Sequence, residues 1–247
     1  MRKLTQAQKD FFGENGFLAI EDVVPKKEVD VLRDRIEAIV RGDLEFPDQG
    51  FQVCDPKKYK GPGDNGEVMG IQLPGRHDPV FKRFLEHPNV VSVAKELLGP
   101  NIAVYTDQVI RKLPGFGKES GFATHFHQDG YYWRNSPPRT INFWYAVDDA
   151  DERHGGMRFI PGSFRRGLME HEAYWDDPVM HSLVTGKAFN RWGVPESEVD
   201  RSKEVSTPIK AGSCVCFGTL TFHASFPNIG SELHRAYAIA FMEAVPK

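Results

Sequence analysis

The feature that most constrains the fold is the series of short strand-like segments that follows Gly99. Turn-forming residues separate these segments, which are "NIAVYTDQVIRKLP", "ATHFHQD", "TINFWYAVDD", "GGMRFIPGS", "GSCVCFGTLTFHA" and "RAYAIAFMEAV". In the third of them, Ile141, Phe143 and Tyr145 occupy every second position, which is the period of a β-strand. Many short strands with Pro-Gly turns favour a sandwich or a jelly-roll barrel over a parallel sheet.

The first 99 residues show helical signals instead. Thr5 and Gln8 have the spacing of an N-terminal capping box, and Val29 and Leu32 share one helix face after Pro25. We predict helices in "TQAQKDFFGENG", "PKKEVDVLRDRIEAIVRG" and "HPNVVSVAKELLG", and a strand in "FLAIEDVV". The expected fold class is therefore mainly β with flanking helices, an α+β arrangement.

Two segments lack clear periodicity. Residues 43–75 are rich in Gly, Pro, Asp and Lys, and we predict a long irregular loop there. Residues 168–206 are aromatic and acidic, and we predict a helical or irregular insertion. The length fits one domain, 1–247, composed of a helical N-terminal part (1–99) and a jelly-roll core (100–247) that carries the insertion.

The composition limits the partners and the compartment. The formal net charge is -3 and the charges are well mixed, so we expect a small-molecule partner, with no nucleic acid and no membrane. The N-terminus shows no apolar stretch with a cleavage site, and no run of 18 apolar residues occurs, so we expect a soluble, cytoplasmic protein. Three cysteines, Cys54, Cys214 and Cys216, are an odd count that predicts buried reduced thiols. No pattern in the chain predicts an oligomeric state.

The stretch "HFHQDGYYW" concentrates candidate metal ligands. On an extended backbone, residues two apart lie on the same side, so His127 and Asp129 can reach one ion while Gln128 points away. Imidazole plus carboxylate suits a borderline divalent ion such as Fe(II), Mn(II), Co(II) or Zn(II) better than Ca or Mg. A facial site needs a third ligand, and His223 in the strand-like C-terminal region is the candidate. Arg235, twelve residues further on, offers a guanidinium fork for a dicarboxylate.

Over nearly its full length the chain resembles the phytanoyl-CoA dioxygenase family of Fe(II)- and 2-oxoglutarate-dependent oxygenases. The matching blocks occur in the family's order: "FFGENGFLAIEDVVP", "HPNVVSVAKELLGPNI", "DQVIRKLPG", "HQDGYYW", "NFWYAVDDADERHGGMRFIPGSF" and "HASFPNIGSELHRAYAIAFM". The resemblance implies a double-stranded β-helix, that is, a cupin-like jelly-roll core with N-terminal helices and an insertion. It also implies Fe(II) as the metal, 2-oxoglutarate as cosubstrate and O2 as oxidant.

Site residues follow from the resemblance position by position. The implied iron ligands are His127, Asp129 and His223. Arg235 is expected to bind the distal carboxylate of 2-oxoglutarate, although the interval from His223 is one residue longer than in some relatives. The other positions that match the cosubstrate pocket of relatives are Ser225, Gln108 and Trp144. The family often has His where this chain has Phe164. Related halogenases lack the carboxylate that Asp129 supplies, so the resemblance favours hydroxylation or desaturation over halogenation.

The residues that contact the substrate are less clearly indicated. Tyr131, Tyr132 and Trp133 follow the metal motif directly, and they form either a wall of the substrate pocket or ordinary packing. His125 lies two residues before His127, which allows three interpretations. It faces the substrate or supports the iron ligands, it is a structural histidine, or it forms an H-x-H zinc pair.

Three functions are therefore compared. The leading hypothesis is a dioxygenase that hydroxylates an unactivated C–H bond of a small molecule, with release of succinate and CO2. A non-catalytic cupin-like protein that binds a metal or small ligand is the first alternative. The second is a zinc hydrolase that uses His125, His127 and His223. No basic cluster suggests a CoA-phosphate site, so the sequence favours a free small molecule over an acyl-CoA thioester.

Overall fold

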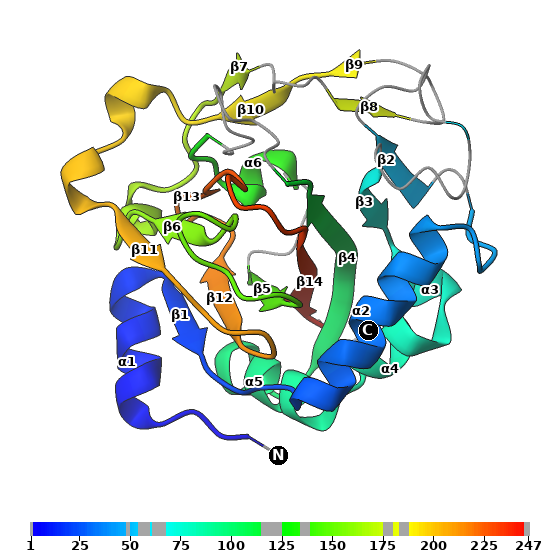
Figure 1. Ribbon diagram of the computed structural model, residues 1–247. Helices are drawn as coiled ribbons and strands as arrows, with labels where there is room; N and C mark the ends of the chain where they lie inside the picture. The colour runs from blue at the N-terminus through cyan, green and yellow to red at the C-terminus, as the bar shows by residue number, and fades with distance from the viewer. Residues whose placement is uncertain are drawn as a thin grey trace.

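The largest element is an antiparallel sheet of nine strands, the major sheet (Figure 1). The computed structural model describes residues 2–47, 50–53, 60, 68–114, 125–133, 139–174, 180–182 and 188–244. The strand order is β1-β12-β5-β14-β4-β3-β2-β8-β9. The strands are β1 (Phe17–Ile20), β2 (Phe51–Val53), β3 (Val68–Gln72), β4 (Ile102–Lys112), β5 (Thr140–Ala146), β8 (Met180–Ser182), β9 (Ala188–Phe189), β12 (Cys214–Gly218) and β14 (His234–Glu243).

A minor sheet faces the inner side of the major sheet. It has the order β11-β6-β13, and its strands are β11 (Val205–Thr207), β6 (Met157–Phe159) and β13 (His223–Ser225). Buried residues of both sheets, including Phe159, Phe217 and Trp144, form one apolar cluster between them. The two facing antiparallel sheets confirm the prediction of a jelly-roll core. A separate two-stranded ribbon consists of β7 (Glu172–Tyr174) and β10 (Arg191–Gly193).

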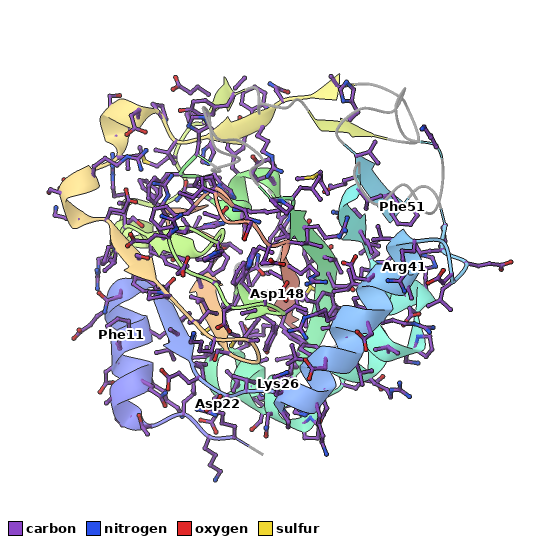
Figure 2. All side chains as sticks on the ribbon, in the orientation of Figure 1. Phe11, Asp22, Lys26, Arg41, Phe51 and Asp148 are labelled. Carbon is purple, nitrogen blue, oxygen red and sulfur yellow. The ribbon has the colours of Figure 1, made fainter. Side chains whose placement is uncertain are left out.

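Helices cover the outer face of the major sheet. The helices are α1 (Gln6–Asn15), α2 (Lys26–Val40), α3 (Pro74–His77), α4 (Pro79–Leu85), α5 (Pro88–Leu98), α6 (Asp129–Tyr132) and the 3-10 turns η2 (Ser163–Arg166), η3 (Glu196–Glu198) and η4 (Arg201–Lys203). Leu32 and Ile36 of α2 are buried in a cluster that α4, α5 and the major sheet share. Figure 2 marks the two ends of α2 with Lys26 and Arg41. The capping box of Thr5 and Gln8 is present at α1.

Strand β5 directs alternate side chains to the helices on one face and to the minor sheet on the other. All seven of its residues are buried. Ile141, Phe143 and Tyr145 belong to the cluster under the helices. Asn142 and Trp144 face the other way, toward the minor sheet, and line a cavity there. The alternation predicted from the sequence therefore separates a structural face from a functional face.

The two segments predicted to be irregular contain strands instead. Within 43–75, β2 and β3 pair with each other, and they join the major sheet through β8 and β4. In the described part of 168–206 the elements are short strands and 3-10 turns, so the prediction of a helical or irregular insertion missed the strands there. Pairing with a neighbouring strand satisfies backbone groups that a segment without helical periodicity cannot satisfy internally. Because β1, β2 and β3 precede residue 99, the N-terminal part also contributes to the sheet.

Two further expectations concern the cysteines and the membrane. Cys214 and Cys216 are free and buried on the helix side of β12, as predicted. Cys54 lies outside the described residues. Among the helices of the described ranges, none combines the length and the apolar character that crossing a membrane requires.

Candidate metal centre

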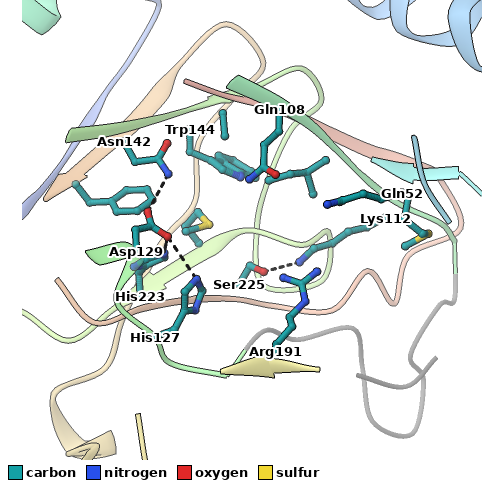
Figure 3. A pocket seen from close by; sticks show the side chains of 15 residues that line it. Gln52, Gln108, Lys112, His127, Asp129, Asn142, Trp144, Arg191, His223 and Ser225 are labelled. Atoms are coloured by element: carbon teal, nitrogen blue, oxygen red, sulfur yellow. Dashed lines mark hydrogen bonds and ion pairs between the residues drawn. The ribbon is translucent and has the colours of Figure 1, made fainter. Parts of the chain in front are cut away.

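Three potential ligands converge between the two sheets. They are His127, Asp129 and His223, and their ligand atoms all lie within 4.8 Å of one another. The Asp129 Oδ1 atom is 3.7 Å from Nε2 of His127 and 3.5 Å from Nε2 of His223 (Figure 3). Both separations exceed hydrogen-bonding distance but fit donors that share one ion, because ligands about 2 Å from a metal lie roughly 3 Å apart.

The backbone around these residues brings them together in two steps. His127 and His223 form an antiparallel bridge in which each amide donates to the other carbonyl, at 3.0 and 3.2 Å. The bridge places His127 beside β13, next to His223, which pairs with β6 on its other side. The chain then turns into α6, so that Asp129 is the first residue of a short helix rather than part of a regular strand. The two residues share a site as predicted, but a turn and not a continuous strand positions the carboxylate.

The hydrogen bonds of the two imidazoles involve Nδ1, so the Nε2 atoms remain available to bind a metal. Nδ1 of His127 lies 2.9 Å from the carbonyl oxygen of His125, and Nδ1 of His223 lies 2.9 Å from that of Thr221. A carbonyl oxygen only accepts, so each Nδ1 carries a proton, and in the neutral imidazole each Nε2 then presents a lone pair. Both Nε2 atoms are the ones that face Asp129. This arrangement is typical of histidines that bind metal ions.

The charge states also suit a divalent cation. Burial, and after it the proximity of His223, lower the pKa of His127 to about 3. Burial acts to raise the pKa of Asp129, but His223, His127 and a hydrogen bond from Asn142 outweigh it and hold this pKa at about 2. At neutral pH the site therefore offers a neutral imidazole beside an ionised carboxylate, which are the protonation states that metal ligation requires.

Asn142 orients the carboxylate and was not anticipated from the sequence. Its Nδ2 donates to Asp129 Oδ2 at 3.0 Å, which leaves Oδ1 directed at the two imidazoles. The only available signal was its place in β5, where it alternates with residues of the helix face. An asparagine on the inner face of a buried strand needs a polar partner, and here the partner is a candidate metal ligand.

The metal ligands form one part of a larger cavity. Its wall also contains apolar side chains from both sheets and a set of polar ones. The apolar lining residues are Met69, Ile110, Trp144, Met157, Phe217 and Ala238. The polar lining residues besides the three ligands and Asn142 are Gln52, Gln108, Lys112, Arg191 and Ser225.

Three of the four residues predicted to bind the cosubstrate line this cavity. Ser225 accepts a hydrogen bond of 2.7 Å from the ammonium of Lys112. Gln108 accepts one of 2.9 Å from Gln72, and Trp144 forms part of the apolar wall. All three lie on strands that run through the barrel. Their roles stay predictions, but their positions agree with them.

Arg235, the fourth residue, lies on the opposite face of β14. Its Nε donates to Asp148 Oδ2 at 2.6 Å, and its Nη2 donates to Oδ1 of the same carboxylate at 3.2 Å. Its Nη1 is 3.2 Å from Glu37 of α2. Side chains alternate along a strand, and Ala238 is the β14 residue that lines the cavity. Residues with even numbers therefore face inward, and Arg235 faces the helices.

Lys112 supplies the cation on the inner face. It is 2% exposed and lies opposite His234 in the pairing of β4 with β14. Its ammonium donates to Ser225 Oγ and to the carbonyl oxygens of Phe226 and Gly155. Gln108 and Lys112 have the same parity on β4, so both reach the cavity, whereas Arg111 between them points to Glu37. Parity within the strand was the sequence signal that identifies Lys112.

The aromatic residues after the metal motif and His125 lie around the ligands. Tyr132 contacts His127 edge-on at 5.8 Å between ring centroids, and Tyr131 stacks on His171 at 4.1 Å. Trp133 packs against Tyr105 at 5.3 Å. His125 is exposed and stacks on Tyr174, and it is not part of the ligand cluster. None of the four lines the cavity.

Gln128 points away from the metal ligands, as predicted, and fastens the motif. Its side-chain amide donates to the carbonyl oxygens of Gly167 and Leu220, and its Oε1 accepts from the amide of Met169. Its own backbone amide donates to His171. These contacts join the motif to two loops, which restricts the positions that His127 and Asp129 can take.

The sequence and the fold both match known proteins. The sequence model of the family described as "Phytanoyl-CoA dioxygenase (PhyH)" matches residues 12–236. "Phytanoyl-CoA dioxygenase 1" of Oryza sativa subsp. japonica is 26% identical, with 96% of this chain and 88% of the rice protein covered. "Phytanoyl-CoA dioxygenase, peroxisomal" of Homo sapiens is 26% identical, with 98% and 69% covered.

Two solved structures share the architecture described above. EvdO2 from Micromonospora carbonacea var. aurantiaca, complexed with 2-oxoglutarate, superposes with a TM-score of 0.72 at 22% identity, covering 98% of this chain and 92% of that one. The epimerase SnoN, in complex with Fe3+, alpha ketoglutarate and nogalamycin RO, gives a TM-score of 0.69 at 18% identity, covering 97% and 83%. These similarities show a common fold.

Proposed function

This chain belongs to the phytanoyl-CoA dioxygenase family, and we propose that it uses Fe(II) and 2-oxoglutarate to hydroxylate an unactivated C–H bond of a small molecule. Family membership makes it an oxygenase. The observation that supports the finer proposal is the cluster of two imidazole Nε2 atoms and one carboxylate oxygen that faces a cavity with a buried lysine. A facial set of this type leaves half of an octahedral coordination sphere open to small ligands.

The hydrogen bonds of each ligand determine which of its atoms would bind the metal. His127 and His223 would each donate through Nε2, since Nδ1 is occupied by a backbone carbonyl. Asp129 would donate through Oδ1, because Asn142 holds Oδ2. Fixed ligand orientations of this kind reduce the reorganisation that accompanies metal binding.

Lys112 is the group that we assign to the distal carboxylate of 2-oxoglutarate. Its ammonium and the Ser225 hydroxyl lie together in the cavity wall, 2.7 Å apart, and both can donate to a carboxylate. Arg235 is engaged by Asp148 and Glu37 on the other face of β14. The earlier expectation for Arg235 therefore gives way to Lys112 in this proposal.

The chemistry comes from the bound cofactors, and the protein positions and shields them. Fe(II), 2-oxoglutarate and O2 together supply an oxidative decarboxylation in which one oxygen atom enters the substrate C–H bond and the other enters succinate, with CO2 released. Trp144 and the other apolar lining residues keep bulk water from the reacting groups. Tyr132, whose ring lies beside His127, packs on the outer side of the ligands.

The proposal is tested by anaerobic addition of Fe(II) and 2-oxoglutarate to the metal-free protein. We expect a weak visible charge-transfer band that saturates with 2-oxoglutarate and is absent from an Asp129→Ala variant. Addition of O2 with a substrate should then release succinate. Tight zinc binding with neither the band nor 2-oxoglutarate-dependent succinate would favour the hydrolase or the binding protein instead.

A further inference from the structure

We infer that Arg191 binds an anionic group of the organic substrate, and that the natural substrate is therefore a small molecule with a carboxylate. This inference rests on the proposed function and identifies its substrate class. Arg191 belongs to β10 of the two-stranded ribbon, within the segment 168–206. It lines the same cavity as the metal ligands, and Figure 3 shows its side chain directed into the cavity.

The alternation of side chains on β10 separates Arg191 from its neighbour. Trp192 is 37% exposed and lies on the outside of the ribbon, whereas Arg191 lies on the cavity side. Arg191 pairs with Tyr174 of β7, so the ribbon holds its backbone extended. An arginine whose side chain enters a cavity needs polar groups or ligands around it there.

The ribbon is attached directly to the metal motif, which fixes the distance of Arg191 from the reacting groups. The Tyr132 hydroxyl donates to the carbonyl of Trp192 at 2.7 Å and accepts from its amide at 2.9 Å. The amide of Val194 donates to the carbonyl of Phe126 at 2.7 Å. These bonds flank Arg191 on its C-terminal side and tie it to residues on both sides of the ligands.

Gly193 permits this close approach. A Cβ atom at this position would lie 2.9 Å from the carbonyl oxygen of Phe126 and 3.1 Å from Cβ of His125. Any larger residue would push the ribbon away from the metal motif, and Arg191 with it. The contact between Gly193 and the backbone of Phe126 therefore also determines where Arg191 lies.

The charges that line the cavity explain why a substrate anion is expected. Its described lining includes one carboxylate, Asp129, and two basic side chains, Lys112 and Arg191. Fe(II) and 2-oxoglutarate cancel each other's formal charge, so among the described lining residues basic groups outnumber acidic ones by one. The two carboxylates of 2-oxoglutarate are accounted for by the metal and by Lys112 with Ser225. A guanidinium fork then suits a further carboxylate, which it binds through two parallel hydrogen bonds.

The test uses a panel of aliphatic and aromatic carboxylic acids, each paired with its primary amide, on the Fe(II)- and 2-oxoglutarate-loaded enzyme. We expect some acids to stimulate succinate release and to perturb the charge-transfer band, and their amides to do neither. In Arg191→Gln the KM for an active acid should rise about 10- to 100-fold, as expected for the loss of a charged hydrogen bond. The exposed Arg153→Gln serves as a matched control and should behave as wild type.

A second titration distinguishes the substrate from the cosubstrate as the ligand of Arg191. The concentration of 2-oxoglutarate that half-saturates the band should be unchanged in Arg191→Gln and raised in Lys112→Gln. Equal weakening in both variants would overturn the inference, because Arg191 would then serve 2-oxoglutarate. Equal stimulation by acids and amides would overturn it as well. Absence of the band in wild type would instead contradict the proposed function itself.

Discussion

The two faces of the strand pair β4 and β14 carry similar residues for different purposes. On the helix face, Arg111 and Arg235 meet Glu37 and Asp148, and the contacts fasten α2 to the sheet. On the cavity face, Lys112 donates to a serine hydroxyl and two carbonyl oxygens beside the metal ligands. The basic residues of the helix face have carboxylate partners and a structural role. The ammonium on the cavity face donates to Ser225 and to two carbonyl oxygens, in the wall where an anionic ligand of the cavity would lie.

The odd or even position of a basic residue within the strand thus decides whether it faces the helices or the cavity. Arg235 and His234 are adjacent in the chain but point to opposite faces of β14. An arginine one residue earlier, at the position of His234, would lie on the other face. A shift of one residue has this effect because the side-chain period of a strand is two.

The largest effect should come from the cavity face, at the metal site. Asp129→Ala removes the only carboxylate of the ligand cluster, so we expect the Fe(II) and 2-oxoglutarate band to disappear and succinate formation to fall by at least about 1000-fold. The exposed Asp34→Ala is the matched control and should leave both unchanged. Full activity of the Asp129 variant would refute the ligand assignment.

Substituting the basic residues one at a time tests the difference between the cavity face and the helix face directly. Lys112→Gln should raise the 2-oxoglutarate concentration for half-saturation by about 10- to 150-fold, which corresponds to the loss of one charge-assisted hydrogen bond. Lys112→Arg keeps the charge and should recover part of the affinity. If Arg235→Gln raised this concentration and Lys112→Gln did not, the original expectation for Arg235 would hold and the two faces would exchange roles.

Arg235 itself should affect stability more than catalysis. Its guanidinium holds both oxygens of Asp148 and contacts Glu37, with a side chain that is 14% exposed. Arg235→Gln removes one of the two arginines that each of these partly buried carboxylates contacts, with Arg33 and Arg111 remaining, so we expect a loss of about 2 kcal/mol in the free energy of unfolding. Urea denaturation of the apo protein measures it. A loss within experimental error would show that the network does not hold α2 in place.

The smallest effect concerns His234, which precedes Arg235 on β14 and faces the opposite side of the strand. Burial, and after it the proximity of Lys112, lower the pKa of His234 to about 3. The unfolded chain, with a pKa near 6.5, binds the proton first, so stability is complete above about pH 6.5 and falls as the pH drops from there toward 3. The slope due to this residue is at most about 1.4 kcal/mol per pH unit.

The measurement for His234 compares urea denaturation at pH 7.5 and pH 5.5. His234→Gln should reduce the difference between these two pH values by about 1 kcal/mol relative to wild type. Other histidines, including His127 with a pKa of about 3, contribute equally to both proteins and cancel. An unchanged difference would mean that His234 accepts a proton in the folded state.

Local pattern was enough to predict much of this protein. Alternating apolar residues predicted the strands of the core, and the capping box of Thr5 predicted the first helix, because these signals depend on neighbours in the chain. The short motif with His127 and Asp129, together with His223, identified the ligand cluster. Segments whose strands exist only by pairing with distant partners, such as β2 with β8, were missed.

Residue identity and local spacing in the chain were sufficient to predict the jelly-roll core, the family and the three ligand types. Which basic side chains reach the cavity depends on how the strands pair. Lys112 and Arg235 are equally basic in the chain, and the register of β4 and β14 places the first inside and the second outside. Arg191 enters the site because hydrogen bonds carry its ribbon to the metal motif from about sixty residues away. Contacts of that range follow from packing, which no local pattern encodes.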